Sequence, residues 1–241
     1  MTTAILSDVH GNLEALDAVL AEIKRRRPKR VFCLGDVVGY GASPNECLAR
    51  VREHCEVVLL GNHDAAASGG PEAARFNIYA RVAAEWTAKT LTRDNREYLV
   101  KLPLTHSGSG FYLVHASPAC PRDWEYLLDR FDAEPQFQYF TEPVCFIGHT
   151  HQPAVYMADP AGCKSLPVGD LTFESGRRYI VNVGSVGQPR DHDPRACFVV
   201  YDEAAGSIEF VRVAYDLEAA QTKIRGAQLP EVLAARLVTG E

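Results

Sequence analysis

The amino-acid sequence predicts an α/β protein, and two observations lead to that class. Short β-rich runs alternate with helical patterns over residues 4–64, in the order strand, helix, strand, helix, strand. This order predicts a largely parallel sheet covered by helices. Further strand-like runs follow in the second half of the chain, and the length of 241 residues suits one large domain. We therefore expect a single α/β domain over residues 1–241.

The first quarter of the chain is expected to supply three strands and two helices. Residues 4–7 form a strand, and the apolar residues of 13–23 recur on one helical face. Residues 30–36 and 56–64 supply the next two strands. The helix between them, residues 43–54, begins with a serine N-cap, a proline at the first helical position and a glutamate that completes a capping box.

Residues 72–101 are expected to be helical, with Thr92 as an N-cap that divides the segment in two. This segment separates two strands that carry polar motifs, so it is a candidate cover for the site that those motifs would form. Residues 110–116 and 144–151 supply the fourth and fifth strands.

The last third of the chain is expected to add four strands and a helical tail. The final two strands are joined through Ala205-Gly206 as a hairpin. The tail begins at Asp216, and Pro230 interrupts it. The four strands are residues 154–159, 179–185, 196–203 and 207–215.

Composition and charge narrow the classes of function. The formal net charge of −6 argues against a dedicated nucleic-acid binder, which usually carries a basic excess. No apolar run approaches the roughly 18 residues of a membrane span, and the first residues, MTTAILSDVHGN, lack the basic region of a signal peptide. Seven cysteines without a Cys-x-x-Cys pair favour free thiols. We expect a cytoplasmic protein, with a homo-oligomer left open.

Polar residues follow the carboxyl ends of five predicted strands. In open α/β sheets ligands bind beyond these ends, so the side chains are expected to converge. His149 and His151 stand two positions apart, and extended chain would point both side chains the same way. A single Asp or His after a strand is commonly a turn or cap residue, but five ends in series predict a metal site. The five ends are Asp8-Val9-His10, Gly35-Asp36, Gly61-Asn62-His63-Asp64, His115 and Gly148-His149-Thr150-His151.

The kinds of donor in these motifs indicate which metals would bind. Imidazole, carboxylate and amide oxygen without thiolate suit manganese, iron, zinc or nickel rather than a structural zinc site built on cysteines. Seven candidate ligands are too many for one ion that keeps a position open for water. The sequence therefore predicts two divalent ions, with manganese as the first expectation.

Taken together, the motifs resemble the signature of the calcineurin-like metallophosphoesterase superfamily. Asp8-x-His10 opens the series, Gly35-Asp36-x-x-Gly39 and Gly61-Asn62-His63-Asp64 follow, and Gly148-His149-x-His151 closes it after His115. The later segment NVGSVGQPR, residues 182–190, resembles a motif of the small bacterial phosphodiesterase branch. The resemblance implies a four-layer α/β/β/α sandwich, in which two mixed β-sheets lie back to back with helices outside.

The resemblance also implies a role for each position. A metal-bridging hydroxide would attack the phosphorus, and His63 would stay off the metals and give its proton to the leaving oxygen. Asn62 is expected to touch the substrate as well as a metal. The first ion would be held by Asp8, His10 and His151, the second by Asn62, His115 and His149, with Asp36 bridging both.

The sequence departs from relatives that dephosphorylate proteins. Those enzymes extend the second motif with an Asp that pairs with the catalytic histidine and an Arg that grips phosphate, and both are missing from residues 35–41. His63 must then be oriented by another group, either Asp64 or a backbone carbonyl. Arg190 is the first candidate for a phosphate-gripping arginine and Arg122 the second, each against the alternative of a surface loop residue.

The expected function is hydrolysis of small phosphodiesters or phosphomonoesters by a dimetal phosphoesterase. The alternative from another class is a scaffold or binding protein that retains the fold without chemistry. Further alternatives are a dinucleoside polyphosphate hydrolase or a protein phosphatase, and a nuclease on long nucleic acid lacks the expected basic balance.

Overall fold

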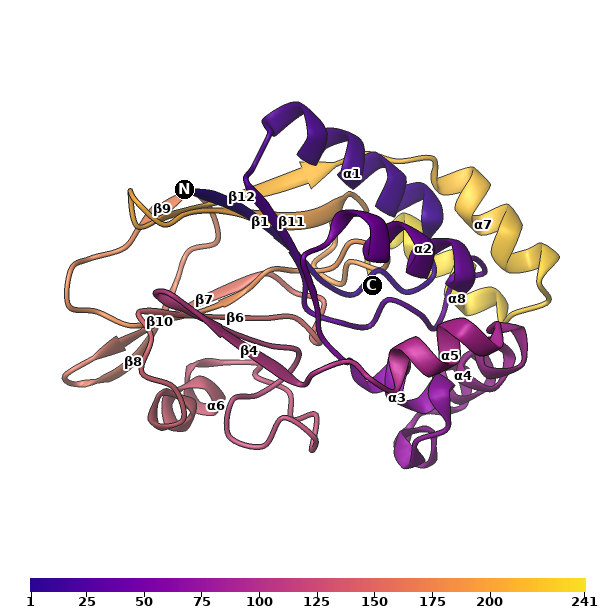
Figure 1. Ribbon diagram of the computed structural model, residues 1–241, viewed down its shortest axis with the longest axis horizontal. Helices are drawn as coiled ribbons and strands as arrows, with labels where there is room; N and C mark the ends of the chain where they lie inside the picture. Colours follow the sequence, from indigo (N-terminus) through magenta and orange to yellow (C-terminus); the bar gives the residue numbers. More distant parts are fainter.

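A computed structural model describes all 241 residues and shows two six-stranded β-sheets with helices on their outer faces (Figure 1). In the first sheet the three N-terminal strands are parallel, and the remaining three are antiparallel to their neighbours. Its strands, in spatial order, are β3 (Val57–Val58), β2 (Arg30–Cys33), β1 (Thr2–Leu6), β11 (Ala196–Asp202), β12 (Ser207–Val213) and β9 (Leu171–Thr172).

The second sheet is also mixed. Strands β5, β6 and β10 run parallel, β4 and β7 pair with this group in antiparallel fashion, and β8 pairs antiparallel with β7. The spatial order is β4 (Thr105–Gly108), β5 (Phe111–Val114), β6 (Val144–Ile147), β10 (Tyr179–Asn182), β7 (Ala154–Asp159) and β8 (Gly162–Leu166).

The helices gather at the outer faces and at one end of the sheets (Figure 1). Helix α1 begins where Asn12 accepts a hydrogen bond from the backbone N–H of Ala15, and Arg27 ends it in a left-handed conformation just before Pro28. The helices are α1 (Leu13–Arg26), α2 (Pro44–His54), α3 (Asn62–Ser68), η1 (Pro71–Arg75), α4 (Ile78–Thr90), α5 (Arg93–Leu99), α6 (Arg130–Ala133), η2 (Glu134–Gln138), α7 (Leu217–Gly226) and α8 (Glu231–Thr239).

Three apolar clusters hold the layers together. Ile5 and Phe32 of the first sheet meet Phe146 of the second in a core between the sheets. Helices α1 and α2 pack on the outer face of the first sheet. The outer face of the second sheet has a thinner cover, in which Phe137 and Phe140 belong to the segment around α6 and η2. The four-layer α/β/β/α arrangement with two mixed sheets is therefore confirmed.

Several details of the predicted elements are wrong. The strands expected over residues 30–36 and 144–151 are shorter than predicted, since β2 ends at Cys33 and β6 at Ile147. The strand expected over residues 56–64 is only β3, since helix α3 already begins at Asn62. Ser43 stands at the N-cap of α2, but its side chain makes no capping hydrogen bond.

Other details are confirmed. Residues 72–101 are mostly helical, and the hydroxyl of Thr92 accepts a hydrogen bond from the backbone N–H of Asn95 at the start of α5. Strands β11 and β12 form the predicted hairpin. All seven cysteines are free. None of the helices combines the length and the apolar character needed to cross a membrane.

Candidate metal centre

The five polar motifs meet at one edge of the two sheets. Asp8 follows β1 and Asp36 follows β2, while His115 follows β5 in the other sheet and the pair His149 and His151 follows β6. All of these side chains are buried. Three groups of side chains bring their ligand atoms within 4.8 Å of one another and could each hold a cation. They are Asp8 with His10 and His151, Asp36 with His115 and His149, and Asp36 with His10 and His63.

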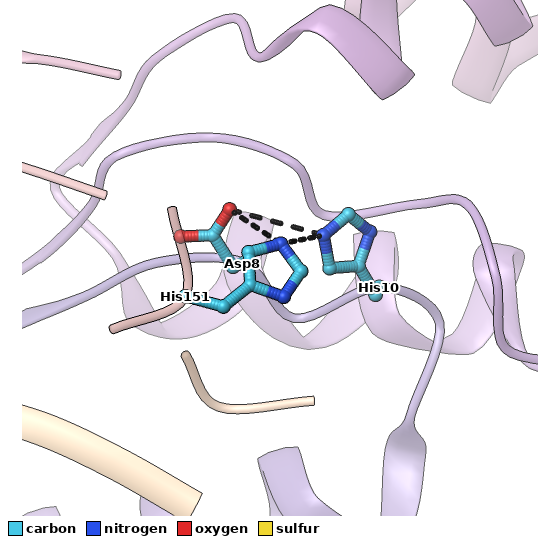
Figure 2. Close-up of side chains that lie close together, drawn as sticks. All are labelled: Asp8, His10 and His151. Atoms are coloured by element: carbon cyan, nitrogen blue, oxygen red, sulfur yellow. Dashed lines mark hydrogen bonds and ion pairs between the residues drawn. The ribbon is translucent and has the colours of Figure 1, made fainter. Parts of the chain in front are cut away.

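The first group is drawn in Figure 2, where the carboxylate of Asp8 and the two imidazoles point at a common spot. The Nε2 atoms of His10 and His151 lie 2.9 Å apart. Oδ1 of Asp8 lies 3.4 Å from Nε2 of His151 and 3.8 Å from Nε2 of His10. One carboxylate and two imidazoles thus surround a space of the size that a single divalent ion occupies.

The second group contains Asp36, which also lies close to His10 of the first group. Oδ2 of Asp36 lies 3.3 Å from Nε2 of His115 and 3.7 Å from Nε2 of His10. The amide oxygen of Asn62 and Nε2 of His115 are buried without a hydrogen-bond partner. Buried polar atoms normally have hydrogen-bond partners, so these two atoms are suited to bind a cation as ligands. Asp36 therefore lies between the two groups.

Backbone carbonyls orient the four imidazoles of the predicted ligand set. Nδ1 of His10 lies 3.1 Å from the carbonyl oxygen of Val38, and the same nitrogen of His115 and of His151 also faces a carbonyl oxygen. A proton on each Nδ1 leaves the lone pair on Nε2 directed into the cluster. His149 is turned the other way, since its Nε2 lies 2.9 Å from the carbonyl oxygen of Trp124.

The backbone geometry of the paired ligands differs from the prediction. His149 and His151 have φ angles of 68° and 62°, which is left-handed rather than extended. Asp8 and His10 repeat this with φ angles of 55° and 50°. Strand β6 ends at Ile147 and the chain turns at once, so alternation along a strand does not direct these side chains. Left-handed conformations at non-glycine residues are uncommon and cluster at functional sites.

Two motif glycines are required by close approach. A Cβ on Gly61 would collide with the backbone nitrogen and the carboxylate of Asp36, and a Cβ on Gly148 would collide with Ser7 and with the carboxylate of Asp8. Each aspartate also accepts a backbone hydrogen bond from the loop that carries the glycine. The N–H of His149, next to Gly148, donates to Asp8 at 3.0 Å, and the N–H of His63, two residues after Gly61, donates to Asp36 at 2.8 Å. The glycines therefore let the loops seat the two carboxylates.

Burial and neighbouring charges set the protonation states. Burial lowers the pKa of His149 to about 3 and holds the pKa values of His10 and His151 well below the ordinary value. Burial opposes a proton on His115 too, but the negative charge of Asp36 outweighs it and raises the pKa of His115 to about 9. Burial raises the pKa of Asp8 to about 6. Three imidazoles are thus neutral, as metal ligands must be, and a cation would replace the proton on the fourth.

His63 lies beside the cluster in an aromatic surrounding. Its ring stacks on Phe76 at a centroid distance of 4.4 Å and lies 4.4 Å from the ring of Tyr40. Burial lowers the pKa of His63 to about 4, and its Nδ1 has no hydrogen-bond partner. Phe76 lies between η1 and α4, so the helical segment 72–101 reaches the site at this residue.

Asp64 does not orient His63 as one alternative predicted. Its Oδ1 accepts a hydrogen bond from the backbone N–H of Val38 at 3.0 Å, and its Oδ2 accepts one from Gly61 at 3.1 Å. Both oxygens are therefore used to fix the loops that carry the neighbouring motifs, and no hydrogen bond joins Asp64 to the ring of His63. Asp64 is the N3 residue of α3, and a carboxylate at N3 typically accepts the backbone N–H of the N-cap residue, here Gly61.

The two predicted arginines differ in position. Arg190 lies near the cluster, where its guanidinium is 5.7 Å from the ring centroid of Tyr40 and donates to Gln188 at 2.8 Å. Arg122 is exposed, and no hydrogen bond or ion pair joins it to the site. Sequence reasoning missed Arg236 of α8, which also donates to the side-chain oxygen of Gln188. No motif surrounds Arg236, and only the packing of the C-terminal helix brings it there.

The fold and the buried donor set define a class of protein. The calcineurin-like phosphoesterase superfamily domain matches residues 1–206, and the chain belongs to this family. The chain is 41% identical over 241 residues to an uncharacterised protein of Methanocaldococcus jannaschii. The aligned region covers 98% of this chain and 97% of that protein. A metallophosphoesterase from Sphaerobacter thermophilus has a crystal structure that matches with a TM-score of 0.89 and 39% identity, over 100% of both chains.

A more distant structure shows the same fold. A hypothetical protein from Pyrococcus horikoshii superposes with a TM-score of 0.80 at 22% identity, over 100% of this chain and 98% of that one. Family membership makes the chain a phosphoesterase relative with candidate metal-binding groups, which agrees with the resemblance seen in the sequence motifs.

Proposed function

We propose that the protein is a dimetal phosphoesterase that hydrolyses small phosphodiesters or phosphomonoesters. The observation that carries the proposal is the pair of buried donor groups, Asp8 with His10 and His151 and Asp36 with His115 and His149, that lie side by side with Asp36 also close to His10. In this assignment Asp36 bridges two ions, for which manganese is the first choice. The first ion takes Asp8, His10 and His151, and the second takes Asn62, His115 and His149.

The donor set fits divalent cations on two grounds. The buried amide oxygen of Asn62 has no hydrogen-bond partner, and Nε2 of His115 faces the carboxylate of Asp36 at 3.3 Å. Nitrogen and oxygen donors without thiolate suit the metals named above. When bound, such a pair of ions lowers the pKa of a shared water and neutralises charge on the phosphoryl oxygens. Two divalent ions outweigh the carboxylates of Asp8 and Asp36, so the site favours an anionic ester.

His63 is assigned as the proton donor to the leaving oxygen. Its ring borders the donor groups, and its backbone N–H is anchored on Asp36 at 2.8 Å. The pKa of about 4 in the free protein is low for an acid at neutral pH. A phosphoester anion beside the ring would raise that pKa, because an opposite charge favours the protonated form. Arg190 is the proposed contact for a substrate oxygen, since its guanidinium is the nearest predicted cation.

The test is turnover of nitrophenyl phosphate monoesters and diesters by protein stripped with chelator and reloaded with manganese. His63→Ala should lower kcat by about 10²–10⁴-fold, the usual contribution of a positioned acid, and leave the metal content unchanged. His54→Ala, a histidine on the exposed side of α2, is the matched control and should behave as the unaltered protein. The scaffold alternative predicts no turnover with any divalent metal in folded protein, and that result would overturn the proposal.

A further inference from the structure

A cavity of about 410 Å³ opens beside the donor cluster on the side of His63. Small-molecule sites commonly span about 300–1,000 Å³, so its size suits one organic group. One wall comes from the segment between α3 and α4, and the other from the loop that carries Trp124. The lining residues are Tyr40, Asn62, His63, Glu72, Arg75, Phe76, Asn77, Ala80, Asp123, Trp124, Tyr126 and His149.

We propose that this cavity binds a nucleobase, so that the leaving group of the substrate is a nucleoside. The inference rests on the proposed phosphoesterase function and names the substrate class for the same site. Four of the lining residues are aromatic side chains other than histidine. Flat heteroaromatic groups bind proteins chiefly by stacking on such rings.

The aromatic rings are placed for stacking. Phe76 lies nearly parallel to the ring of His63, at 27°, and Tyr126 lies nearly parallel to His149, at 26°, with centroids 4.2 Å apart. Tyr126 is 50% exposed although it belongs to the cavity wall. The two rings therefore line the cavity from different segments of the chain, and each is stacked on an imidazole of the site.

Polar atoms in the walls distinguish a base from a plain phenyl ring. The indole N–H of Trp124 and a carboxylate oxygen of Glu72 are buried without hydrogen-bond partners. A nucleobase carries both acceptors and donors at its edge and can satisfy both kinds of group. The acidic Glu72 and Asp123 outweigh the basic Arg75, so these lining side chains carry a net negative charge. This charge disfavours a second phosphate in the cavity and favours a neutral group.

The side on which the cavity opens decides which bond breaks. His63, Asn62 and His149 line it, whereas Asp8 and His151 do not. A group held there lies next to the proposed proton donor, so its oxygen is the one that leaves. A hydroxide derived from water forms the new bond to phosphorus, and the bond from phosphorus to the nucleoside oxygen breaks. That oxygen keeps the electron pair and takes the proton of His63.

The first test measures binding without catalysis, in the full chain kept free of metal by chelator. Adenosine is titrated by calorimetry, with ribose as the probe that lacks a base. Adenosine should bind saturably and ribose should not. Phe76→Ala should weaken adenosine binding by about tenfold or more, the value of a lost stacking partner. Tyr79→Ala is the matched control, because this aromatic residue is 47% exposed and outside the cavity.

Three outcomes would overturn the inference: no saturable adenosine binding by about 10 mM, equal binding of ribose, or unchanged binding after Phe76→Ala in folded protein. Turnover of glycerol phosphate, which has no base, tests the proposed function separately. Glycerol phosphate hydrolysis without adenosine binding removes only the nucleobase assignment. Adenosine binding without hydrolysis of any phosphoester removes the proposed function instead.

Discussion

The substitution Gly148→Ala tests the packing that seats Asp8. The added methyl would lie 2.7 Å from Cβ of Ser7 and still closer to Oγ of Ser7 and the carboxylate of Asp8. Ordinary contacts between such atoms are 3.4–4 Å, so the neighbours must move by about 1 Å. These neighbours are fully buried, and overpacking of a dense interior costs about 1–3 kcal/mol.

The substitution should lower both the thermal stability of the protein and its affinity for manganese. For a chain of this length each kcal/mol shifts Tm by about 2–4 °C, so Tm of the metal-free protein should fall by about 2–12 °C. Asp8 also accepts the backbone N–H of His149 at 3.0 Å, so both loops shift together. A displaced ligand shell should weaken manganese binding by about 10–100-fold, as mutations around metal ligands do.

Scanning calorimetry in chelator and manganese titration measure the two effects. Gly169→Ala is the control, because no atom lies within 4 Å of its added methyl and its φ is not left-handed. If Gly148→Ala leaves both Tm and manganese affinity at the level of Gly169→Ala, the close approach does not constrain Asp8 and the reasoning fails.

Three further changes probe the site. Asp64→Ala leaves the backbone N–H groups of Val38 and Gly61 without their acceptor, so the urea midpoint should fall by the equivalent of about 1–3 kcal/mol per orphaned group; an unchanged midpoint would contradict this. Arg190→Ala should raise KM for nitrophenyl phosphate by about tenfold with a smaller change in kcat, as expected for a lost charged contact. An unchanged KM in steady-state kinetics would mean that the arginine only packs on its neighbours. Manganese affinity should rise with pH up to about 9, by at most about tenfold per unit, because His115, with a pKa of about 9, must lose its proton before it can bind; calorimetry at several pH values would expose a flat profile.

Local sequence patterns were enough to predict the residues that converge. Strands end in polar motifs, and the carboxyl ends of parallel strands lie at the same edge, so Asp8, Asp36 and His115 could be grouped without knowing the sheet order. The cap at Thr92 and the hairpin at Ala205-Gly206 were also predictable, because they depend on a few adjacent residues.

Features that depend on distant contacts were not predictable. Nothing local to β11 reveals that it pairs with β1, about 200 residues away, and this pairing divides the motif strands between two sheets. The same holds for Arg236, which only the docking of α8 brings to Gln188. The left-handed turns at His149 and His151 were missed because these residue types rarely adopt such angles unless the surrounding packing imposes them.

The division of the ligands between two sheets has a mechanical consequence. Asp8 and Asp36 follow strands of the first sheet, and His115 and His149 follow strands of the second. Bound cations would therefore link the two sheets at this edge. Without cations only the proton on His115 offsets the charge of these carboxylates, while the apolar core around Phe146 still joins the two sheets. In the metal-free protein, local unfolding should then begin at this edge, before the two sheets separate.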